Sequence, residues 1–351
     1  MNYYLAKDIK EKHKHNAGSK ARLDIEKTME RLGFLPAGLH HTTITSNRVL
    51  HYMRTRANVA RMAATIGKGD TLVLQYPTRF YRLVCRIAHL LGAHIVTFVH
   101  DLQCFRHKIF IAKEEIRRLN MSDDLIVCNN VVRRWLRDNG FVGYNKKGMI
   151  ETLQVFDFFS EAKSPERKQT WPMHKIVYAG QLARMKNSFL YDFGEYIKGY
   201  SVNVYGKGFD SKNAKNPEKF DVKGFMFPDE LIGRAEGDFG LVWDGNSVDS
   251  CSGNFGEYLR INTPHKISLY IRCGLPLLIW RKAAMAGFVE ENGIGICIDS
   301  LRDISGIYER LTKDEYDRMC DNVSEVSRRI SEGYYFSNAV SRLLLQEDNN
   351  N

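Results

Sequence analysis

The chain has 351 residues, of which 44% are hydrophobic and 26% charged, a composition typical of a globular protein too long for one core. It has no apolar run of the ~18 residues that a membrane-spanning helix needs, and its first residues lack the apolar core of a signal peptide. Its seven cysteines are scattered without a CxxC pair. They argue against a disulfide framework or a cysteine-rich metal site and favour a reducing, cytoplasmic compartment.

The net charge of +10 is concentrated in the first half of the chain. Residues 1–150 hold 26 Lys and Arg against 12 Asp and Glu, which leaves 25 and 29 of the totals of 51 and 41 for the rest. A basic first half predicts contact with an anionic partner: a membrane surface, a lipid-linked phosphate or nucleic acid. A solvated surface rich in Lys and Arg is the alternative.

Strand and helix signals alternate through the first 150 residues, which indicates a doubly wound parallel sheet. A short strand near the N-terminus leads into a polar loop that ends at Asn16, Gly18 and Ser19. These residues would contact a ligand at a strand-to-helix turn, or Ser19 would simply cap the next helix. Helices are expected over 21–32, 49–66, 80–91 and 131–139, and strands over 71–75, 94–99 and 125–128.

Ionisable and polar residues follow two of these strands. The apolar strand over 94–99 runs directly into His100 and Asp101, and Gln75 closes the preceding strand. Because open α/β sheets place their sites at the carboxyl ends of strands, we expect acid–base chemistry at His100 and Asp101. A structural cap by Asp101 and a packed His100 are the alternative. Arg106 follows and is a candidate contact, with Gln75, for an acceptor.

A second α/β series begins at about residue 175, after a polar and irregular stretch that indicates a linker. Its first strand ends at Gly180, and the following loop carries Arg184 and Lys186. Such a loop would hold a phosphate through backbone N–H groups and Arg184. The two glycines at 206 and 208 lack the third glycine of a dinucleotide-binding pattern, so we reject a nicotinamide-cofactor site.

The stretch over 242–279 has the clearest start and stop signals. Thr263 at the N-cap, Pro264 at the first helical position and Gly274 past the end predict a short helix with Lys266 in its first turn. A helix N-terminus with a lysine is a natural anion site. An ordinary βαβ unit with a solvated lysine is equally compatible with the spacing.

The sequences of several segments resemble those of the glucosyltransferase 3 family and the related bacterial β-1,6-galactofuranosyltransferases. The segments are GDTLVLQYPT, IVTFVHDLQCFR, VYAGQLARMKN, FPDELIGRAEGDFGLVW, NTPHKISLYIRCGLPLLI and ENGIGICI. The resemblance implies an α/β fold of the GT-B type, with two Rossmann-like domains facing a cleft and a C-terminal helix that returns to the first domain. The expected bounds are 1–155 for the acceptor domain, 156–172 for the linker, 173–333 for the donor domain, 334–346 for the returning helix and 347–351 for a disordered tail.

The resemblance also implies a donor site for a nucleotide sugar. Arg184 and Lys266 match positions that contact the donor diphosphate, and Tyr205 and Phe225 match positions around the nucleobase. The remaining expected donor contacts are Gly180 at the head of the Arg184 loop, Asn262, Pro264 and His265 at the helix start, Asp244 near the sugar, and Asn16, Gly18 and Ser19 in the first domain.

The implied reaction moves a hexose, galactofuranose or glucose, from a UDP-sugar to a hydroxyl of a glycan, lipid-linked or glycoprotein acceptor, in bacterial surface polysaccharide or glycoprotein synthesis. Asp101 would be the base, with inversion, and no metal or other cofactor is expected because cations neutralise the leaving diphosphate. The chain has Thr263-Pro264-His265 where retaining enzymes often carry an acid.

A homo-oligomer, dimer or tetramer, and a peripheral contact with the inner face of the cell membrane complete the expectation. A basic nucleic-acid-binding or modifying protein is one alternative, although the chain lacks a recognised nucleic-acid motif, so we expect no nucleic-acid partner. A non-catalytic assembly subunit with the same fold is the other.

Overall fold

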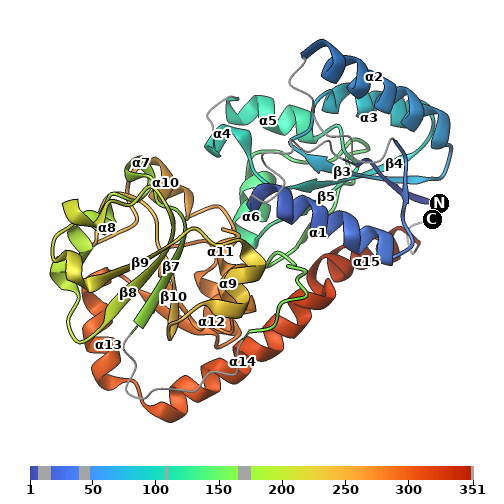
Figure 1. Cartoon of the computed structure of the whole chain (residues 1–351). Helices are drawn as coiled ribbons and strands as arrows, with labels where there is room; N and C mark the ends of the chain where they lie inside the picture. The colour runs from blue at the N-terminus through green and yellow to red at the C-terminus, as the bar shows by residue number, and fades with distance from the viewer. Residues whose placement is uncertain (7–16, 39–47, 107–109, 165–174, 349–351) are drawn as a thin grey trace. The chain divides into compact units, whose positions relative to one another are not determined.

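The computed structural model describes residues 1–6, 17–38, 48–106, 110–164 and 175–348. The chain forms two compact units (Figure 1). Unit 1 comprises Met1–Asp157 and Gly333–Asn351, and unit 2 comprises Phe158–Glu332. The chain therefore crosses between the units twice.

Unit 1 is built on a six-stranded parallel sheet in the order β2-β1-β3-β4-β5-β6. All six residues of β3 are buried, as expected for a strand covered by helices on both faces. The register pairs Leu72 with Ile95 and Gln75 with Phe98. The strands are β1 (Asn2–Tyr4), β2 (Leu35–Pro36), β3 (Thr71–Tyr76), β4 (His94–Val99), β5 (Asp124–Val127) and β6 (Ile150–Thr152).

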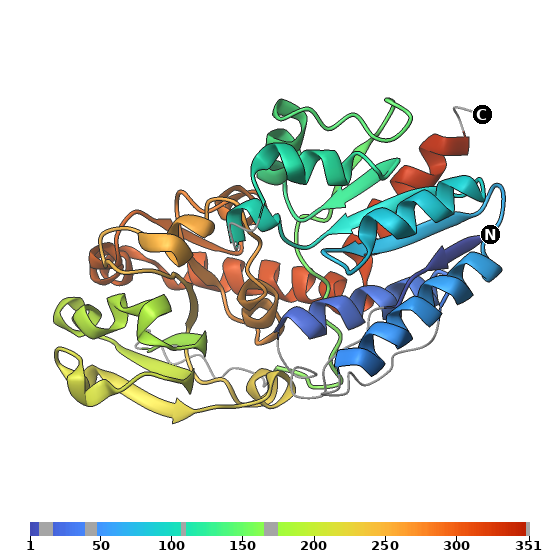
Figure 2. The same ribbon diagram turned by 90° about the horizontal axis from the view of Figure 1, so that it is seen from above.

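Helices cover both faces of this sheet (Figure 2). α6 illustrates how the sequence starts them, because the Asn129 side chain accepts the backbone N–H groups of Val131 and Val132 at 3.0 Å each. The helices of unit 1 are α1 (Ala17–Arg31), α2 (Arg48–Thr65), α3 (Tyr81–Leu90), α4 (Gln103–Arg106), α5 (Ala112–Leu119), α6 (Asn130–Asp138) and α15 (Tyr334–Asp348).

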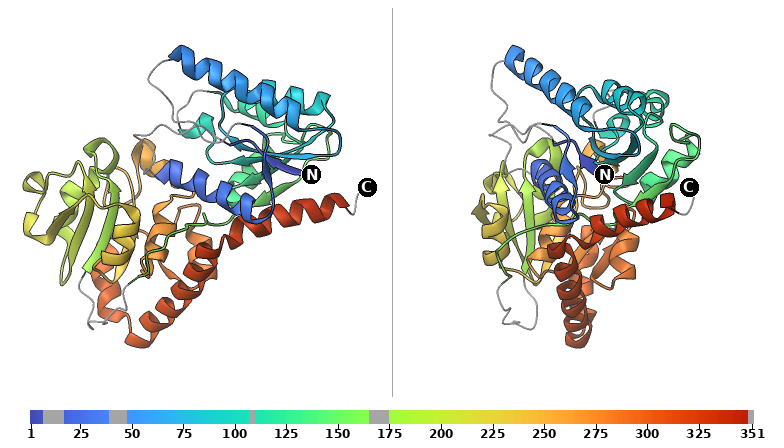
Figure 3. Two further views of the ribbon diagram at one scale, coloured as in Figure 1. Left: turned by 45° about the vertical axis from the view of Figure 1, so that its right-hand side comes forward. Right: turned by 90° about the vertical axis from the view of Figure 1, so that its right-hand side faces the viewer.

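The C-terminal helix α15 packs on unit 1, as predicted from the sequence, beside α1, β5 and β6 (Figure 3). Asp157 fixes its start, since its carboxylate accepts the backbone N–H groups of Tyr335 at 3.2 Å and Phe336 at 2.8 Å. The helix continues through residues 347 and 348, which we expected to be disordered. Leu, Gln and Glu sustain a helix, and no glycine or proline stops it there.

Unit 2 repeats the design with the strand order β12-β11-β10-β7-β8-β9, again all parallel. β7 and β10 are central, and the largest buried side chains of the unit, Trp243 and Trp280, follow β10 and end β11. The strands are β7 (Lys175–Gln181), β8 (Ser201–Lys207), β9 (Phe220–Gly224), β10 (Phe239–Val242), β11 (Leu277–Trp280) and β12 (Gly295–Ile298).

The helices of unit 2 are short except for α14, whose apolar positions pack on α11. None of the helices in the described ranges combines the length and apolar character that crossing a bilayer requires. The helices are α7 (Arg184–Asn187), α8 (Phe189–Phe193), α9 (Pro228–Arg234), α10 (Gly253–Tyr258), α11 (Lys266–Arg272), α12 (Ala286–Glu291), α13 (Ile304–Arg310) and α14 (Lys313–Glu332).

The start of the expected linker is packed into the protein. Phe156, Phe158 and Phe159 are at most 7% exposed, and Asp157 between them is 3% exposed. The crossover therefore belongs to the cores of the two units, because four consecutive residues of this kind bury too much apolar surface to stay in solvent. The polar residues 165–174, which suggested a linker, lie outside the described ranges.

Candidate active site

Three charged side chains converge at the carboxyl ends of the central strands of unit 2. Asp244 follows β10 and is 5% exposed. The ammonium of Lys266, the first residue of α11, donates to Asp244 Oδ1 at 2.9 Å, and the Lys186 ammonium of α7 lies 3.6 Å from Oδ2. Two lysines thus share one carboxylate, and the cluster keeps one net positive charge at the edge of the sheet where open α/β folds bind ligands.

Tyr178 of β7 holds Asp244 from the core side. Its hydroxyl lies 3.1 Å from Asp244 Oδ1, 2.8 Å from Asn187 Oδ1 and 2.8 Å from the Trp243 carbonyl oxygen. The Lys266 ammonium also sits 4.6 Å from the centre of the Tyr178 ring. A buried carboxylate with this many fixed neighbours has one orientation, so the two lysines are held at a set spacing.

Burial and the carboxylate act on Lys266 in opposite directions. Burial is the larger effect and lowers the pKa of Lys266, Lys186 lowers it further, and Asp244 raises it. The same desolvation raises the pKa of Tyr178 well above its usual value. Lys266 therefore needs an adjacent anion to hold its charge. Asp244 supplies that anion.

The two loops after β7 and β8 approach each other through glycines. A Cβ added to Gly206 would lie 2.0 Å from the carbonyl oxygen of Gly180, and both glycines have positive φ, 149° and 138°. The loops then pair through Leu182 N–H and the Lys207 carbonyl at 3.0 Å. No side chain fits between these two backbones. Gly180 itself is exposed, and we call the exposed start of the loop after β7 the rim of the site.

Arg184 lies at this rim and outside the charged cluster. Its exposed guanidinium stacks 4.7 Å from the Tyr191 ring. The cation that reaches Asp244 from the same loop is Lys186, which was not among the predicted donor contacts. Tyr178 and Asn187 were not predicted as site residues either. A tyrosine inside an apolar strand predicts a core residue, and an asparagine in a helix predicts a residue at the surface.

The two aromatic residues expected near a nucleobase occupy different environments. Tyr205 is 3% exposed within β8, and its hydroxyl accepts the backbone N–H of Glu236 at 3.1 Å. Phe225 is 49% exposed just past β9, edge-to-face with Phe227 at 5.1 Å and with the Lys207 ammonium 5.2 Å from its ring centre. Phe225 therefore presents an exposed aromatic ring, whereas the Tyr205 side chain is part of the packing of the sheet.

The helix expected to begin at Pro264 begins at Lys266, which corrects the predicted cap. His265 is the N-cap residue, and Pro264 lies in the turn before it, where its carbonyl accepts the Ile267 N–H at 3.0 Å. Proline fits this preceding turn as well as a first helical position, so its presence did not fix the start. Asn262 precedes the turn, and its buried Oδ1 has no hydrogen-bond partner among the described residues.

In unit 1, two of the predicted residues, Gln75 and His100, meet at the carboxyl ends of β3 and β4. The buried amide of Gln75 donates from Nε2 to Glu26 Oε1 at 3.0 Å, and its Oε1 lies 2.7 Å from His100 Nε2. Because the amide oxygen only accepts, Nε2 of His100 carries the proton. The imidazole is also stacked 6.0 Å from the Phe156 ring. His100 is thus held in one tautomer and one orientation.

Asp101 lies beside this chain of hydrogen bonds and faces two cations. Its side chain is 17% exposed and forms an ion pair with Arg106, the residue expected to contact an acceptor. Arg22 of α1 also interacts electrostatically with Asp101, and burial lowers the pKa of its guanidinium to about 10 against the opposing effects of Asp101 and Glu26. At the carboxyl edge of the unit 1 sheet, the Asp101 carboxylate is thus held beside the positive charges of Arg106 and Arg22.

The N-terminal residues expected to face the donor are placed differently from the prediction. α1 begins at Ala17, four residues before the expected start, so Gly18 and Ser19 lie in its first turn. Asn16 lies outside the described residues. The early start has a simple cause: Ala, Ser and Lys are all compatible with a first helical turn, and one glycine does not prevent it.

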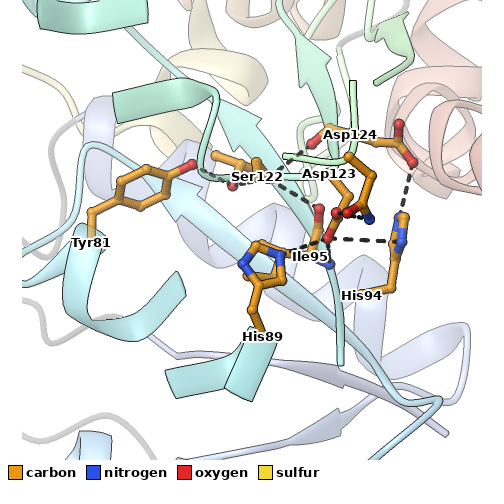
Figure 4. Close-up of polar contacts among 9 residues, drawn as sticks. Tyr81, His89, His94, Ile95, Ser122, Asp123 and Asp124 are labelled. Atoms are coloured by element: carbon orange, nitrogen blue, oxygen red, sulfur yellow. Dashed lines mark hydrogen bonds and ion pairs between the residues drawn. The ribbon is translucent and has the colours of Figure 1, made fainter. Parts of the chain in front are cut away.

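A separate polar cluster closes the opposite edge of the unit 1 sheet (Figure 4). His89 Nε2 lies 3.0 Å from Asp123 Oδ2, and His94 Nε2 lies 2.9 Å from Asp124 Oδ2. The remaining carboxylate oxygens accept from Asn145 at 3.0 Å and from the Met149 N–H at 2.6 Å. These contacts join the strand ends, and the buried Nδ1 of His89 has no hydrogen-bond partner in the part of the chain that the structure describes. Within the described ranges, no three His, Cys, Asp or Glu side chains are arranged to hold a metal ion.

Comparison with known proteins identifies both units. The model for the glucosyltransferase 3-like N-terminal domain matches residues 2–150, and the model for the glucosyltransferase 3-like C-terminal domain matches residues 176–343. The chain is 28% identical over 340 residues to the β-1,6-galactofuranosyltransferase WbbI of Escherichia coli K12, covering 94% of this chain and 95% of WbbI. It is 25% identical to glucosyltransferase 3 of Streptococcus gordonii, covering 90% of each chain.

Solved structures share the fold at low sequence identity. Anabaena HepE, in complex with UDP and glucose, aligns with a TM-score of 0.55 and 12% identity over 99% of both chains. WaaG, a glycosyltransferase involved in lipopolysaccharide biosynthesis, aligns with a TM-score of 0.55 and 11% identity over 96% of this chain and 98% of WaaG. Together with two parallel-stranded Rossmann-like units, these neighbours confirm the predicted GT-B type of fold.

Proposed function

Because the chain belongs to the glucosyltransferase 3-like family of glycosyltransferases, we propose that it transfers a hexose from a UDP-sugar to a hydroxyl of a glycan or glycoconjugate. One observation carries the proposal: two lysines, Lys186 and Lys266, share the single carboxylate of Asp244 at the ligand-binding edge of unit 2. Two neighbouring ammonium groups favour the binding of a ligand with more than one negative charge, and the diphosphate of a nucleotide sugar has two.

The diphosphate would bind to this cluster and to the loop that begins at Gly180. The ammonium groups of Lys266 and Lys186 would each direct one N–H group from Asp244 to a phosphate oxygen. Arg184, in the loop after β7, would add a third positive charge. Charge-assisted hydrogen bonds of this kind stabilise the leaving UDP as its bond to the sugar breaks. Lysine and arginine charges then serve the purpose for which other transferases use a metal ion, so we propose a metal-independent reaction.

The rest of the donor would be read by the neighbouring side chains. The exposed ring of Phe225 offers a stacking surface for the uracil base. The buried Asn262 Oδ1, which the described residues leave without a hydrogen bond, would accept from a donor hydroxyl. Pro264 and His265 shape the turn between Asn262 and Lys266, and Asn16, Gly18 and Ser19 remain predicted donor contacts of unit 1.

Asp101 would act as the general base. The acceptor hydroxyl loses its proton to the Asp101 carboxylate as its oxygen bonds to the anomeric carbon, and the bond from that carbon to the UDP oxygen breaks on the opposite side. The anomeric configuration is then inverted. Arg106, paired with Asp101, keeps the carboxylate in position, and His100, hydrogen-bonded to Gln75, precedes Asp101 in the chain. Gln75 and Arg106 also remain the proposed contacts for the acceptor.

The choice of sugar, the acceptor and the assembly complete the proposal. WbbI is named a galactofuranosyltransferase and the streptococcal relatives are named glucosyltransferases, so UDP-galactofuranose and UDP-glucose are the donors to test. A lipid-linked glycan or a glycoprotein in bacterial surface polysaccharide or glycoprotein synthesis is the proposed acceptor. We propose a homo-oligomer, a dimer or a tetramer, at the cytoplasmic side of the membrane.

A thermal-shift panel tests the donor site. UDP, UDP-glucose, UDP-galactose, UDP-galactofuranose, a GDP-sugar and a dTDP-sugar are each added to the full chain and to the Lys186→Ala, Lys266→Ala variant. A ligand present at 100 times its Kd stabilises the folded state by about 2.7 kcal/mol. We expect UDP and one UDP-sugar to raise the Tm of the wild type and to leave the variant unchanged. Equal shifts in both proteins, or none with any nucleotide, would contradict the proposal.

A further inference from the structure

The first half of α2 carries apolar side chains but contributes none of them to the core. Every described residue from Val49 to Ala57 is exposed or half-buried, and the buried face of the helix starts only at Asn58, followed by Val59 and Met62. Val49 is 67% exposed and Met53 61% exposed. Within the described ranges, the core of unit 1 therefore does not enclose the apolar side chains at this end of the helix.

These side chains join the start of α3 in one surface. Figures 1 and 3 show α2 alongside α3 on the same side of the unit 1 sheet. Tyr52 of α2 lies edge-to-face with Phe80, the residue that precedes α3, at 5.6 Å between ring centres. The guanidinium groups of Arg56 and Arg79 lie 5.4 Å and 5.5 Å from the centre of the Tyr52 ring. We call this surface the α2–α3 patch: Val49, Tyr52, Met53, Arg56, Arg79 and Phe80.

The charge around the patch is almost entirely positive. Between residues 48 and 86 the sole acidic residue is Asp70, and it pairs with the N-terminal ammonium at 2.7 Å. One arginine of the region, Arg82, approaches Glu114 of α5 at 4.0 Å. The basic residues of the region are Arg48, Arg54, Arg56, Arg61, Lys68, Arg79, Arg82 and Arg86.

We propose that the α2–α3 patch docks on an anionic membrane surface, with Val49 and Met53 entering the lipid and Arg56 and Arg79 contacting lipid phosphates. Aliphatic side chains beside arginines, on a helix without acidic residues, are the pattern of a helix that lies in the membrane interface. A nucleic-acid surface would use the arginines and rings but leave the aliphatic side chains in water. A second copy would bring two positive patches face to face, which opposes a symmetric contact.

The position of the patch within unit 1 suits this role. Phe80 follows β3 by four residues, so the patch lies on the side of the sheet edge where Gln75, His100 and Asp101 end their strands. An acceptor carried on a lipid would be presented at that edge. The identity of the acceptor rests on the proposed function, whereas membrane docking does not, because it is measured without any sugar donor.

Vesicle co-sedimentation of the full chain tests the proposal. The probes are vesicles of phosphatidylcholine alone and vesicles that also contain phosphatidylglycerol. We expect binding to the anionic vesicles and not to the neutral ones. Arg56→Gln with Arg79→Gln should weaken that binding by at least about tenfold, because each cation near an anionic surface contributes roughly a fivefold effect. Val49→Ser with Met53→Ser should weaken it to a similar extent through lost burial.

A matched control removes two charges elsewhere. Arg310→Gln with Arg318→Gln lowers the net charge equally, from exposed positions on α13 and α14 of unit 2, and should bind vesicles like the wild type. Circular dichroism of each variant checks its folding. Wild-type protein that ignores anionic vesicles overturns the proposal, as do patch variants that bind like the control. Loss of an oligomer or of RNA binding in the patch variants, with vesicle binding unchanged, would assign the surface to another partner and likewise overturn it.

Discussion

Replacement of Lys266 by Met tests whether the lysine cluster binds the donor or only stabilises the fold. The change removes the ammonium that lies 2.9 Å from Asp244 Oδ1 and keeps a side chain of similar length. Breaking a buried ion pair costs about 3–5 kcal/mol when the remaining charge has no other partner. Lys186 stays 3.6 Å from the other carboxylate oxygen. We therefore expect the free energy of unfolding to fall by a smaller amount, about 1–3 kcal/mol.

The same substitution should weaken UDP binding strongly. A hydrogen bond between charged groups contributes about 1.5–3 kcal/mol, which corresponds to an increase in the Kd of about 10- to 100-fold. Isothermal titration calorimetry at one temperature, below the Tm of both proteins, measures the Kd directly. Urea unfolding in the absence of nucleotide measures the stability of the same samples.

The double variant Lys266→Met, Asp244→Asn separates the two effects. The amide that replaces the Asp244 carboxylate carries no charge that needs the missing ammonium, so we expect the free energy of unfolding to recover in part. UDP binding should stay weak, because the cation that meets the diphosphate is still absent. Recovery of UDP affinity in the double variant, or wild-type affinity in Lys266→Met, would refute the role assigned to Lys266.

Three further changes test other parts of the account. Asp101→Asn should lower kcat by at least about 10²-fold and leave the Kd for UDP unchanged, as steady-state kinetics and calorimetry will show; an active variant would remove Asp101 as the base. Burial raises the pKa of Asp157 to about 7, so the folded state binds this proton more tightly than the unfolded chain. The free energy of unfolding should then fall as the pH rises from about 4 to about 7, by up to about 1.4 kcal/mol per pH unit. Urea unfolding measures this dependence, and the Asp157→Asn variant should lack it. A variant with the same pH profile as the wild type would contradict the assignment to Asp157. Gly206→Ala should destabilise unit 2 by more than about 1 kcal/mol, because its Cβ would lie 2.0 Å from the Gly180 carbonyl oxygen; a melting curve like that of the wild type would contradict the close approach of the two loops.

The alternation of strands and helices could be predicted from the sequence because buried parallel strands read as short apolar runs. The strand expected over 94–99 is β4, and the helix expected over 131–139 is α6, which differs by one residue at each end. Helix starts were less predictable. Pro264 fits a preceding turn as well as a first helical position, and Gly18 does not prevent a helix from starting at Ala17.

The charged cluster of unit 2 was only partly predictable. Lys266 and Asp244 were expected at the site, but the partner from the loop after β7 is Lys186 and not Arg184. The two cations lie two positions apart in a short helix, so they point in different directions. The sequence does not show which of them turns towards Asp244. Contacts between residues as far apart as Tyr178 and Asp244 depend on the packing of β7 against β10, which periodicity does not encode.

The products of a single-donor reaction show whether the chain is an inverting UDP-sugar transferase. The full chain is incubated with UDP-galactofuranose or UDP-glucose and a hydroxyl-bearing glycan acceptor, and the UDP and the new glycoside are followed by NMR. We expect stoichiometric UDP and glycoside from one donor, with inverted anomeric configuration, and loss of both products in the Asp101→Asn variant. Absence of turnover with either donor would exclude the proposed transfer reaction, and a glycoside with retained configuration would exclude the inverting mechanism.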